Sequence, residues 1–267
     1  MLITFNSIEN FAEACRPVRA KDIHHAGSSS WTGYCSFQDA LSKATVGDES
    51  YVIEAEKLIA RLDVDLPETK AWETVRSTYG GRVSLSDWLT GAPTPMRRRK
   101  RSQSDIAPLK IVVSTTCHAT VTAETMKQRG AAILALLLKV QQIRPVQLFL
   151  LAEMHGVRDG WHYQLIRVES QPLAVGVAAF ALCHVGFARQ LTYSLARHLD
   201  RFNGGFPDGR ETFRTDKYPA MRRERLGLAE QDIVVATLDQ DDPLISDPVA
   251  WVKNQLENIA SNLGGLC

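Results

Sequence analysis

The stretch KIVVSTTCHATVTAETMKQRGAAILALLLKVQQIRPVQLFLLAE, residues 110–153, decides the fold. It begins with a β-branched run over residues 111–115, which is typical of a buried strand. Thr122 can cap the helix that follows, and the apolar residues of that helix predict a position covered on nearly all sides. Arg144-Pro145 ends the helix, and residues 146–153 form a second apolar strand. Strand, helix and strand in this order predict a parallel βαβ unit.

The residues after this stretch extend the same pattern. A short glycine-containing turn leads into the alternating segment 161–169, which predicts a strand antiparallel to the one before it. An apolar helix over residues 172–199, a strand over residues 232–238 and a final helix over residues 249–263 follow. This order predicts a three-layer, Rossmann-like α/β fold with a mostly parallel sheet over residues 109–267.

The residues before the βαβ unit have a different pattern. Apolar residues recur with helical spacing, as in YVIEAEKLIARLDV (residues 51–64), and predict a mainly helical N-terminal region over residues 1–95. The segment PTPMRRRKRSQSD, residues 93–105, joins two prolines to five consecutive basic residues. That composition is typical of an exposed linker, so we expect a basic linker over residues 96–108.

Composition and charge exclude several classes of protein. The 267 residues have a net charge of +1, so only a local basic patch can attract nucleic acid. The five cysteines lack CxxC spacing and the N-terminus lacks a signal-peptide pattern, which favours free thiols in a reducing cytoplasm. The apolar run over residues 172–188 is at the short limit for a membrane span. We interpret it as a buried helix and expect no membrane partner.

Two basic clusters are candidate nucleic-acid contacts. The first consists of Arg97, Arg98, Arg99, Lys100 and Arg101, and the second, in KYPAMRRERL, contains Lys217, Arg222 and Arg223. Such cations contact phosphates with a salt-dependent affinity, and the aromatic residues near the second cluster offer faces of the kind that single-strand binders use. The alternative interpretation is a solvated, flexible linker.

The loop between the first strand and the helix is a second candidate site. It contains Ser114, Thr115, Thr116, Cys117 and His118, and it follows the carboxyl end of a strand, where open α/β sheets bind ligands. Cys117 beside His118 also raises the idea of a nucleophile and its base, but sequence neighbours rarely have the geometry of such a pair. We therefore interpret the loop as a ligand or partner loop, or as a structural one, and assign no catalytic residue.

Histidine and aspartate clusters are the candidate metal ligands. His24 and His25 are adjacent, so their side chains point apart, and Asp239, Asp241 and Asp242 have the composition of a turn. We therefore predict neither a metal ion nor another cofactor. Trp31 stands between turn-forming residues, where burial is the favoured interpretation and an exposed partner site is the alternative.

Several segments of the chain have sequence patterns that resemble those of a known family. They are the strand at residues 110–115, ETMKQRGAAILAL, VQLFLLAE, DIVVATL before DPVAWVKNQL, and the N-terminal segments SSSWTGYCSFQDAL and GGRVSLSDWLTGAPTPM. The C-terminal pieces resemble a degenerate von Willebrand factor A-like domain of the kind carried by uncharacterised bacteriophage proteins, and the two N-terminal segments look like recurring phage patterns. True A-type domains hold Mg²⁺ with D-x-S-x-S after the first strand. Here that place reads STTCH, so the resemblance carries over no metal ligand.

The resemblance and the basic clusters lead to one preferred function and two alternatives. The preferred function is a non-enzymatic phage binding or recruitment protein in the host cytoplasm. Its partner is single-stranded DNA or another phage or host protein, such as an RNA polymerase or a replication component. One version is a single-strand-binding transcription activator of phages that package an RNA polymerase in the virion. The alternatives are a hydrolase or transferase that uses Cys117 and His118 or a metal ion, and a virion or assembly component.

Overall fold

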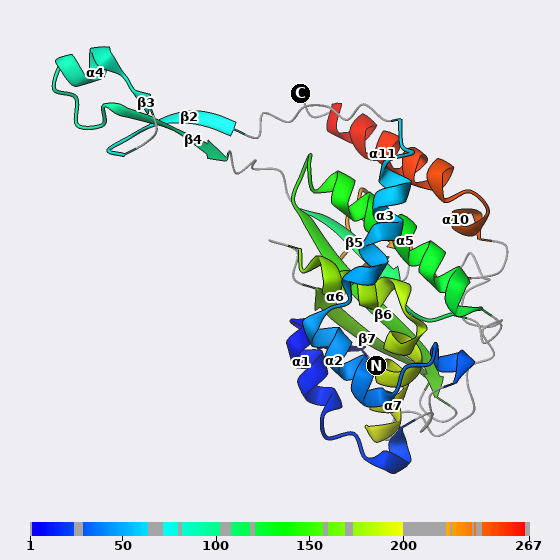
Figure 1. Ribbon diagram of the computed structural model, residues 1–267. Helices are drawn as coiled ribbons and strands as arrows, with labels where there is room; N and C mark the ends of the chain where they lie inside the picture. Colours follow the sequence, from blue (N-terminus) through cyan, green and yellow to red (C-terminus); the bar gives the residue numbers. More distant parts are fainter. Residues whose placement is uncertain are drawn as a thin grey trace.

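A computed structural model shows how the chain is organised. It describes residues 2–23, 29–63, 72–79, 82–101, 108–117, 121–156, 160–168, 173–199, 223–224, 226–236, 238 and 242–264. The elements form two parts (Figure 1). The first part, which we call the body, holds a five-stranded sheet and most of the helices, and the second, which we call the arm, spans residues 72–101 and holds a three-stranded sheet and one short helix.

The sheet of the body has the strand order β1-β7-β6-β5-β8. Its strands are β1 (Leu2–Phe5), β5 (Leu109–Ser114), β6 (Val146–Gly156), β7 (Gly160–Val168) and β8 (Ile233–Val235). β5 runs parallel to β6 and to β8, β1 runs parallel to β7, and the hairpin of β6 and β7 is antiparallel. The predicted α/β class with a mostly parallel, Rossmann-like sheet is therefore confirmed, together with the predicted antiparallel strand.

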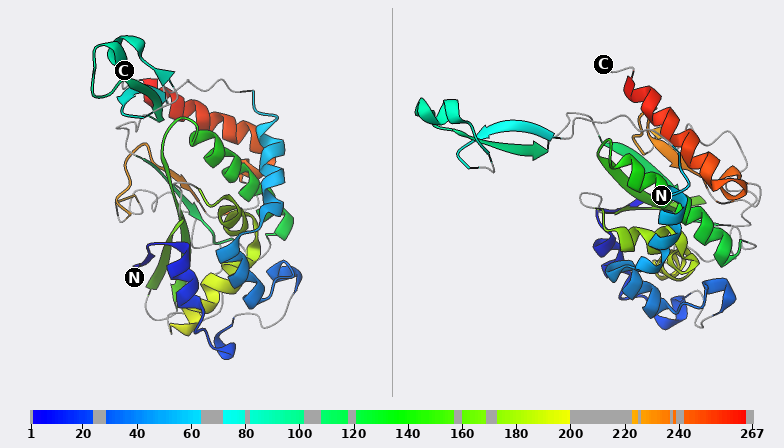
Figure 2. Two further views of the ribbon diagram at one scale, coloured as in Figure 1. Left: turned by 60° about the vertical axis from the view of Figure 1, so that its left-hand side comes forward. Right: turned by 45° about the horizontal axis from the view of Figure 1, so that its top comes forward.

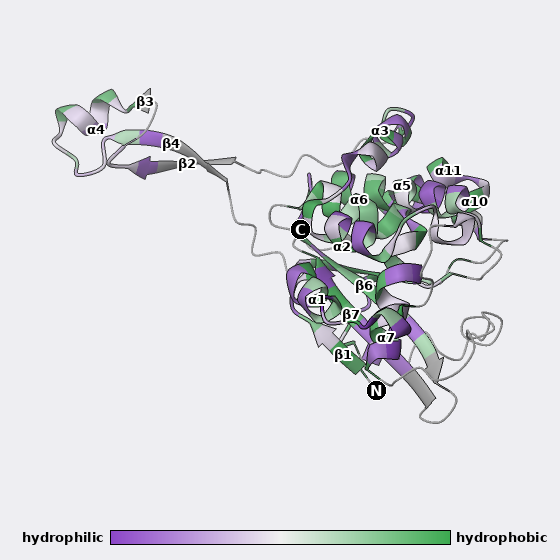
Figure 3. Ribbon diagram, turned by 60° about the horizontal axis from the view of Figure 1, so that its bottom comes forward, coloured by the Kyte–Doolittle hydropathy of each residue, from purple (hydrophilic) through white to green (hydrophobic). Residues whose placement is uncertain are grey.

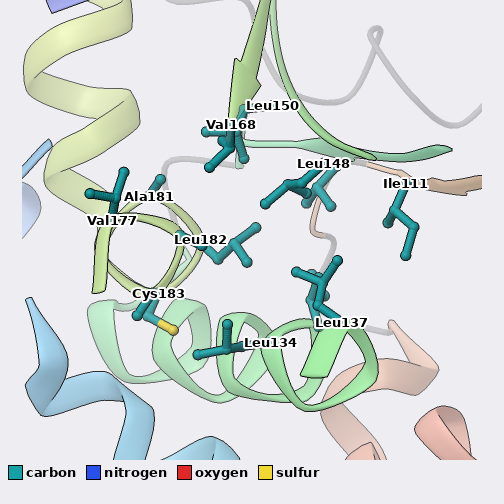
Figure 4. Close-up of a cluster of buried hydrophobic side chains, with 14 of the residues drawn as sticks. Ile111, Leu134, Leu137, Leu148, Leu150, Val168, Val177, Ala181, Leu182 and Cys183 are labelled. Carbon is teal, nitrogen blue, oxygen red and sulfur yellow. The ribbon is translucent and has the colours of Figure 1, made fainter. Parts of the chain in front are cut away.

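The helices of the body are packed in tiers. α5 (Ala123–Val140) and α6 (Val175–Cys183) lie next to the sheet, and α3 (Val52–Ile59) and α11 (Pro248–Gly264) pack on α5 from the outside (Figures 2 and 4). Because α5 contacts the sheet on one side and helices on the others, its middle is apolar all round, as predicted. The remaining helices are α1 (Ile8–Cys15), α2 (Phe37–Val46), α7 (Tyr193–His198), α10 (Pro243–Ser246), the 3-10 turns Ala20–Asp22, Ser30–Thr32 and Glu49–Tyr51, and the π-helix Phe187–Thr192.

One hydrophobic core joins the N-terminal helices to the sheet. Phe11 of α1 belongs to the same buried cluster as Ile111 of β5 and Leu148 of β6. Figure 4 shows Leu137 of α5 and Leu182 of α6 between the helices and the strands. The predicted mainly helical N-terminal region contains α1, α2 and α3, which share the core of the main sheet, and its strand β1 joins that sheet. The boundary predicted near residue 95 therefore does not separate two cores.

Glycine permits the close approach of α5 and α6. A Cβ on Gly130 would lie 2.5 Å from the carbonyl oxygen of Leu182 and 2.6 Å from Cα of Cys183, both of which are backbone atoms. A larger residue at this position would have to push the two helices apart. A second approach fixes the loop after α2, where the amide of Asp48 donates a hydrogen bond of 2.9 Å to the carbonyl of Gly176.

The long apolar helix predicted over residues 172–199 is broken at His184. α6 ends at Cys183, and the helical chain that resumes at Phe187 is bent by 78° relative to it. The His184 ring stacks on Phe180 at 5.2 Å, and its Nδ1 accepts a hydrogen bond of 2.9 Å from the amide of Gly186. Within the described ranges no single helix has the length and apolar character to cross a membrane, and the bent pair meets that test only when its halves are combined.

The arm consists of β2 (Trp72–Ser77), β3 (Arg82–Val83), α4 (Leu85–Leu89) and β4 (Met96–Arg101). β4 is the central strand and runs antiparallel to both β2 and β3. The predicted linker over residues 96–108 is therefore wrong for residues 96–101, while residues 102–107 lie outside the described residues. Arg97 is exposed, but composition says nothing about backbone pairing, and this run is held extended by β2 along its length and by β3 at its start.

Candidate nucleic-acid interface

The basic run is divided between the two faces of the arm sheet. Arg97, Arg99 and Arg101 alternate along β4 with Arg98 and Lys100. Because successive residues of a strand belong to opposite faces, the first three share one face and the other two share the opposite face. The basic run is therefore divided into two sets of residues, one on each face of the sheet, and each set can be substituted separately.

Arg97 is the centre of a row of three arginines. It pairs with Arg76 on β2 and with Arg82 on β3. Directly paired residues lie on the same face of a sheet, and like charges placed directly opposite one another destabilise it. The row thus lowers the stability of the arm, and a bound anion would offset that cost.

Two more pairs extend this side of the sheet. Thr74 pairs with Arg99, and Trp72 pairs with Arg101. The register places Arg76, Arg82, Arg97, Arg99 and Arg101 at positions on one side of the sheet, and we call these positions the arginine face; the side chains described there are those of Arg76 and Arg97. Guanidinium groups bind phosphate in a bidentate manner.

The charge of the chain is distributed unevenly. Residues 72–101 contain seven Lys or Arg and two Asp or Glu. The rest of the chain contains 24 Lys or Arg and 28 Asp or Glu. The net charge near zero, which led us to expect no global field, therefore combines a basic arm with an acidic remainder. Such a charge distribution repels a polyanion from the body and attracts it to the arm.

One carboxylate connects the arginine face to helix α4. Asp87 of α4 lies 3.4 Å from a terminal nitrogen of Arg76, and the side chain of Arg76 remains 65% exposed. At that exposure the pair contributes little to stability. Its consequence is geometric, because it places α4 beside the arginine face while the guanidinium of Arg76 stays accessible. The side chain of Arg97 is also exposed.

Helix α4 has an apolar side that faces solvent. Leu85, Trp88 and Leu89 are 70%, 62% and 76% exposed. Their spacing of three and four residues places them on the same side of the helix. We call these three residues the α4 apolar patch, and Figure 3 shows hydrophobic colour on parts of α4.

The second basic cluster has a different role where it is described. Lys217 and Arg222 lie outside the described residues. Arg223 donates hydrogen bonds of 2.8 Å to the carbonyl of Ala229 and 2.9 Å to the carbonyl of Asp232. Its guanidinium thus links backbone carbonyls of the loop that leads into β8. This structural role was not predicted from the sequence.

The predicted ligand loop is buried at the end of β5. Residues 114–117 are at most 7% exposed. Thr115 donates a hydrogen bond of 3.4 Å to the carbonyl of Leu151, and Thr116 accepts one of 3.0 Å from the amide of Glu153. These bonds continue the pairing of β5 with β6 beyond the end of the strand. His118 lies outside the described residues, so the pair with Cys117 and the ligand-binding role stay predictions.

A fully buried arginine braces this edge of the sheet. Arg129 of α5 donates one hydrogen bond of 3.0 Å to the carbonyl of Ser114 and another to the carbonyl of Ala236. It thereby ties the end of β5 to the end of β8. Burial lowers the pKa of Arg129 to about 10, so the guanidinium is still charged at neutral pH. The only signal in the sequence was a basic residue directly before the apolar middle of the helix.

A second buried arginine, Arg189, joins the N-terminal helices to the same edge. It donates hydrogen bonds of 2.6 Å to the carbonyl of Trp31 and 2.9 Å to the carbonyl of Val121, and it lies 3.5 Å from Sγ of Cys117. The guanidinium also lies over the Trp31 ring, 4.8 Å from its centroid. Trp31 is partly buried against a small apolar cluster, which agrees with the favoured interpretation of this residue.

The described residues offer few groups that could bind a metal ion or react as a thiolate. No group of three or more His, Cys, Asp or Glu side chains in that part of the chain could hold a metal ion. Asp242 accepts a hydrogen bond of 2.9 Å from the amide of Leu244, as in a turn, whereas Asp239, Asp241, His24 and His25 lie outside the described residues. Burial raises the pKa of Cys183 to about 12, which keeps this thiol protonated and unreactive.

The fold and the interface define a mostly parallel α/β protein with a basic β-arm. The chain belongs to the family described as "Domain of unknown function (DUF7192)", whose model matches residues 1–260. The matched region includes both the body and the arm, so the arm is part of the family unit. No curated protein and no solved structure matches the chain.

Proposed function

We propose that the protein is a non-enzymatic nucleic-acid-binding protein that holds single-stranded DNA along the arginine face of its arm. The observation that carries the proposal is the register of β4, which places Arg97 between Arg76 and Arg82. Three like charges in one row are unfavourable for a sheet by itself and favourable for a sheet that meets a row of phosphates. The acidic remainder of the chain directs such a ligand to the arm.

The width of the arm favours a single strand over a duplex. The major groove of B-DNA admits a two-stranded ribbon, whereas the arm sheet has three strands with the basic one in the middle. Alternate residues of a strand are about 6.8 Å apart, so Arg97, Arg99 and Arg101 span about 14 Å. That length accommodates a few nucleotides of a single strand.

The resemblance to phage A-type domains supplies the setting of this proposal. In that setting the protein acts in the host cytoplasm, and the body recruits a phage or host protein, such as an RNA polymerase or a replication component, to the bound strand. A role in transcription is one version. The hydrolase or transferase alternative has less support, because Cys117 is 7% exposed and its sulfur lies against Arg189.

A matched pair of double variants tests the proposal. R97E/R99E reverses two charges on the arginine face, and R98E/K100E reverses two charges on the opposite face of the same strand. Binding of a fluorescently labelled oligo(dT) 20-mer is measured by anisotropy between about 50 and 300 mM salt. We expect R97E/R99E to weaken binding at least about tenfold and R98E/K100E less than about threefold, because only the first pair meets the phosphates.

The salt dependence adds an independent readout. Five phosphate contacts on a single strand predict a slope of log affinity against log salt of about −3.5, which becomes shallower by about 1.4 in R97E/R99E. Equal losses in the two variants would mean that net charge rather than the arginine face attracts DNA. Absence of binding by the natural chain at the lowest salt would exclude nucleic acid as the ligand of the arm.

A further inference from the structure

A hollow on the outside of the body has both apolar and acidic side chains in its lining. It has a volume of about 530 Å³ and lies where α3 and the 3-10 turn before it meet the start of α6. Val52, Ile53 and Val175 supply the apolar part, and Ile53 is 54% exposed. Glu49 and Glu56 supply the acidic part, and both are exposed. We call this place the α3 hollow. An accessible apolar surface with charged neighbours marks an interaction site.

The carboxylates of the α3 hollow are not neutralised within the described part of the chain. Two lysines close by, Lys57 and Lys127, both pair with Glu54, at 3.2 and 3.5 Å. Among the described residues, neither Glu49 nor Glu56 has an ion-pair partner. A partner that fits the α3 hollow therefore combines exposed apolar side chains with positive charge.

The arm has both of these properties. Ten large hydrophobic side chains are exposed in the described residues, and five of them lie within residues 79–89, including the three of the α4 apolar patch. The arm also contains seven Lys or Arg and only two Asp or Glu. Figure 1 and the right-hand view of Figure 2 show the arm extending away from the body, so α4 is presented to a second molecule.

The charge of the arm lies behind the α4 apolar patch rather than beside it. Helical spacing places Asp87 on the opposite side of α4 from Trp88 and its two leucine neighbours, and Asp87 lies 3.4 Å from Arg76. When the patch is seated in a hollow, the guanidinium of Arg76 is about 10 Å away, which is the diameter of a helix. Its attraction to carboxylates there is therefore long-range and sensitive to salt.

We propose that the α4 apolar patch of one copy docks in the α3 hollow of a second copy, so that the chain forms a dimer with exchanged arms. A twofold axis makes the two contacts identical and closes the assembly. Charge complementarity favours this occupant, because the arm is basic and the remainder of the chain, with 24 Lys or Arg and 28 Asp or Glu, is acidic. The inference is independent of DNA binding, which the proposed function assigns to the strands of the arm.

Sedimentation velocity on the full chain, purified free of nucleic acid, measures the self-association. Chain concentrations from about 1 to 200 µM suit a contact of this small size. W88E places a charge in the α4 apolar patch, and I53E places one in the α3 hollow. Y34E is the matched control, because Tyr34 is 75% exposed on the body and does not line the hollow. Circular dichroism and thermal unfolding are recorded for each variant, and the exposure of all three positions predicts normal folding.

We expect the natural chain and Y34E to dimerise. W88E and I53E should each raise the dissociation constant at least about tenfold, because a charge replaces a central apolar contact. Mixing W88E with I53E gives the sharpest readout. A dimer of either variant alone lacks both contacts, whereas a mixed dimer keeps one, in which the arm of I53E docks in the hollow of W88E. The mixture should therefore associate more tightly than either variant alone.

The double variant E49Q/E56Q isolates the electrostatic part of the contact. It keeps the shape of the two side chains and removes their charges. We expect the dissociation constant to rise about threefold at 50 mM salt and the difference from the natural chain to disappear at about 300 mM salt.

Three outcomes would overturn the inference. The first is a natural chain that stays monomeric over the whole concentration range. The second is a dimer that is lost in W88E but kept in I53E, which would make the patch a contact of arm with arm. The third is a mixture of W88E and I53E that associates no better than its components. The anisotropy measurement with oligo(dT) tests DNA binding separately from all three.

Discussion

The body and the arm are built on different physical principles. The body buries apolar side chains from its helices and its sheet in one large core. In the arm, the buried side chains among the described residues are two serines, Ser77 and Ser84. The body is therefore stabilised by the hydrophobic effect, whereas the arm depends on backbone pairing, which is marginal for so small a sheet. Among the described residues of the arm, no apolar core restricts the choice of side chain.

Arginine has a different role in each part. Arg129 and Arg189 are buried in the body, where they donate to backbone carbonyls and connect distant segments. Arg76 and Arg97 of the arm are exposed like charges paired across two strands, and the one carboxylate beside them in the described residues is Asp87, next to Arg76. A ligand that binds the folded arm will therefore also stabilise it.

Removal of Arg129 gives the largest expected loss of stability in the body. Arg129→Ala removes two hydrogen bonds from a buried charged donor and leaves a cavity, so we expect the free energy of unfolding to fall by about 3–5 kcal/mol. Arg167→Ala, at an exposed position of β7, is the control and should change it by less than about 0.5 kcal/mol. Urea unfolding measures both, and equal effects would contradict the structural role of Arg129.

A pair of glycine substitutions compares the two parts directly. Gly130→Ala forces a methyl group against the backbone of α6 and is expected to cost up to about 3 kcal/mol of global stability. Gly91→Ala meets no atom within 4 Å, but its φ of +71° is unfavourable for alanine, and the expected cost of about 1 kcal/mol is confined to the arm.

Hydrogen exchange separates the local effect from the global one. We expect Gly91→Ala to accelerate exchange of the β4 amides while the thermal midpoint of the body stays unchanged. Gly130→Ala should instead lower that midpoint. If Gly91→Ala lowered the body's midpoint as well, the arm and the body would unfold as one unit, and the comparison would fail.

Acid is expected to act on the body through His184. Burial, with a smaller contribution from Lys43, lowers the pKa of His184 from 6.5 to about 4, so the folded state holds the ring neutral. The unfolded chain takes up a proton below pH 6.5 and the folded chain only near pH 4, so stability falls as the pH falls through that window. We expect a loss of about 2 kcal/mol between pH 7 and pH 5 from this group.

The substitution His184→Gln checks the origin of this pH dependence. It removes the titrating ring, so the free energy of unfolding should depend less on pH between pH 7 and pH 5 than it does in the natural chain. Urea unfolding at several pH values provides the comparison. Identical slopes for the two proteins would show that other groups account for the acid sensitivity.

The periodic parts of the chain were predictable because their signals are local. Thr122 accepts a hydrogen bond of 3.1 Å from the amide of Thr125, as expected for a helix cap, and the predicted strand at residues 161–169 is β7 within one residue. The predicted final helix agrees with α11 to the same precision. Hydrophobic spacing and capping residues were sufficient for these elements, since each depends on neighbours within a few positions.

The candidate site was predictable only in part. The sequence drew attention to the basic run, but the arginine face also needs Arg76 and Arg82, which come from two other strands. Pairing between strands depends on contacts far apart in the sequence and on a register that composition does not encode. The same reason explains why β1 was missed, because its partner β7 follows more than 150 residues later.

The sequence by itself determined the kinds of element in this protein: a βαβ unit, a helix apolar on all sides and a run of five basic residues. Those features follow from the spacing of side chains along a single segment. The tertiary structure decided which arginines are buried in the body and which form a face of the arm. Burial and register arise only when distant segments meet, and the chemistry of a guanidinium group depends on whether it then contacts a backbone carbonyl or the solvent.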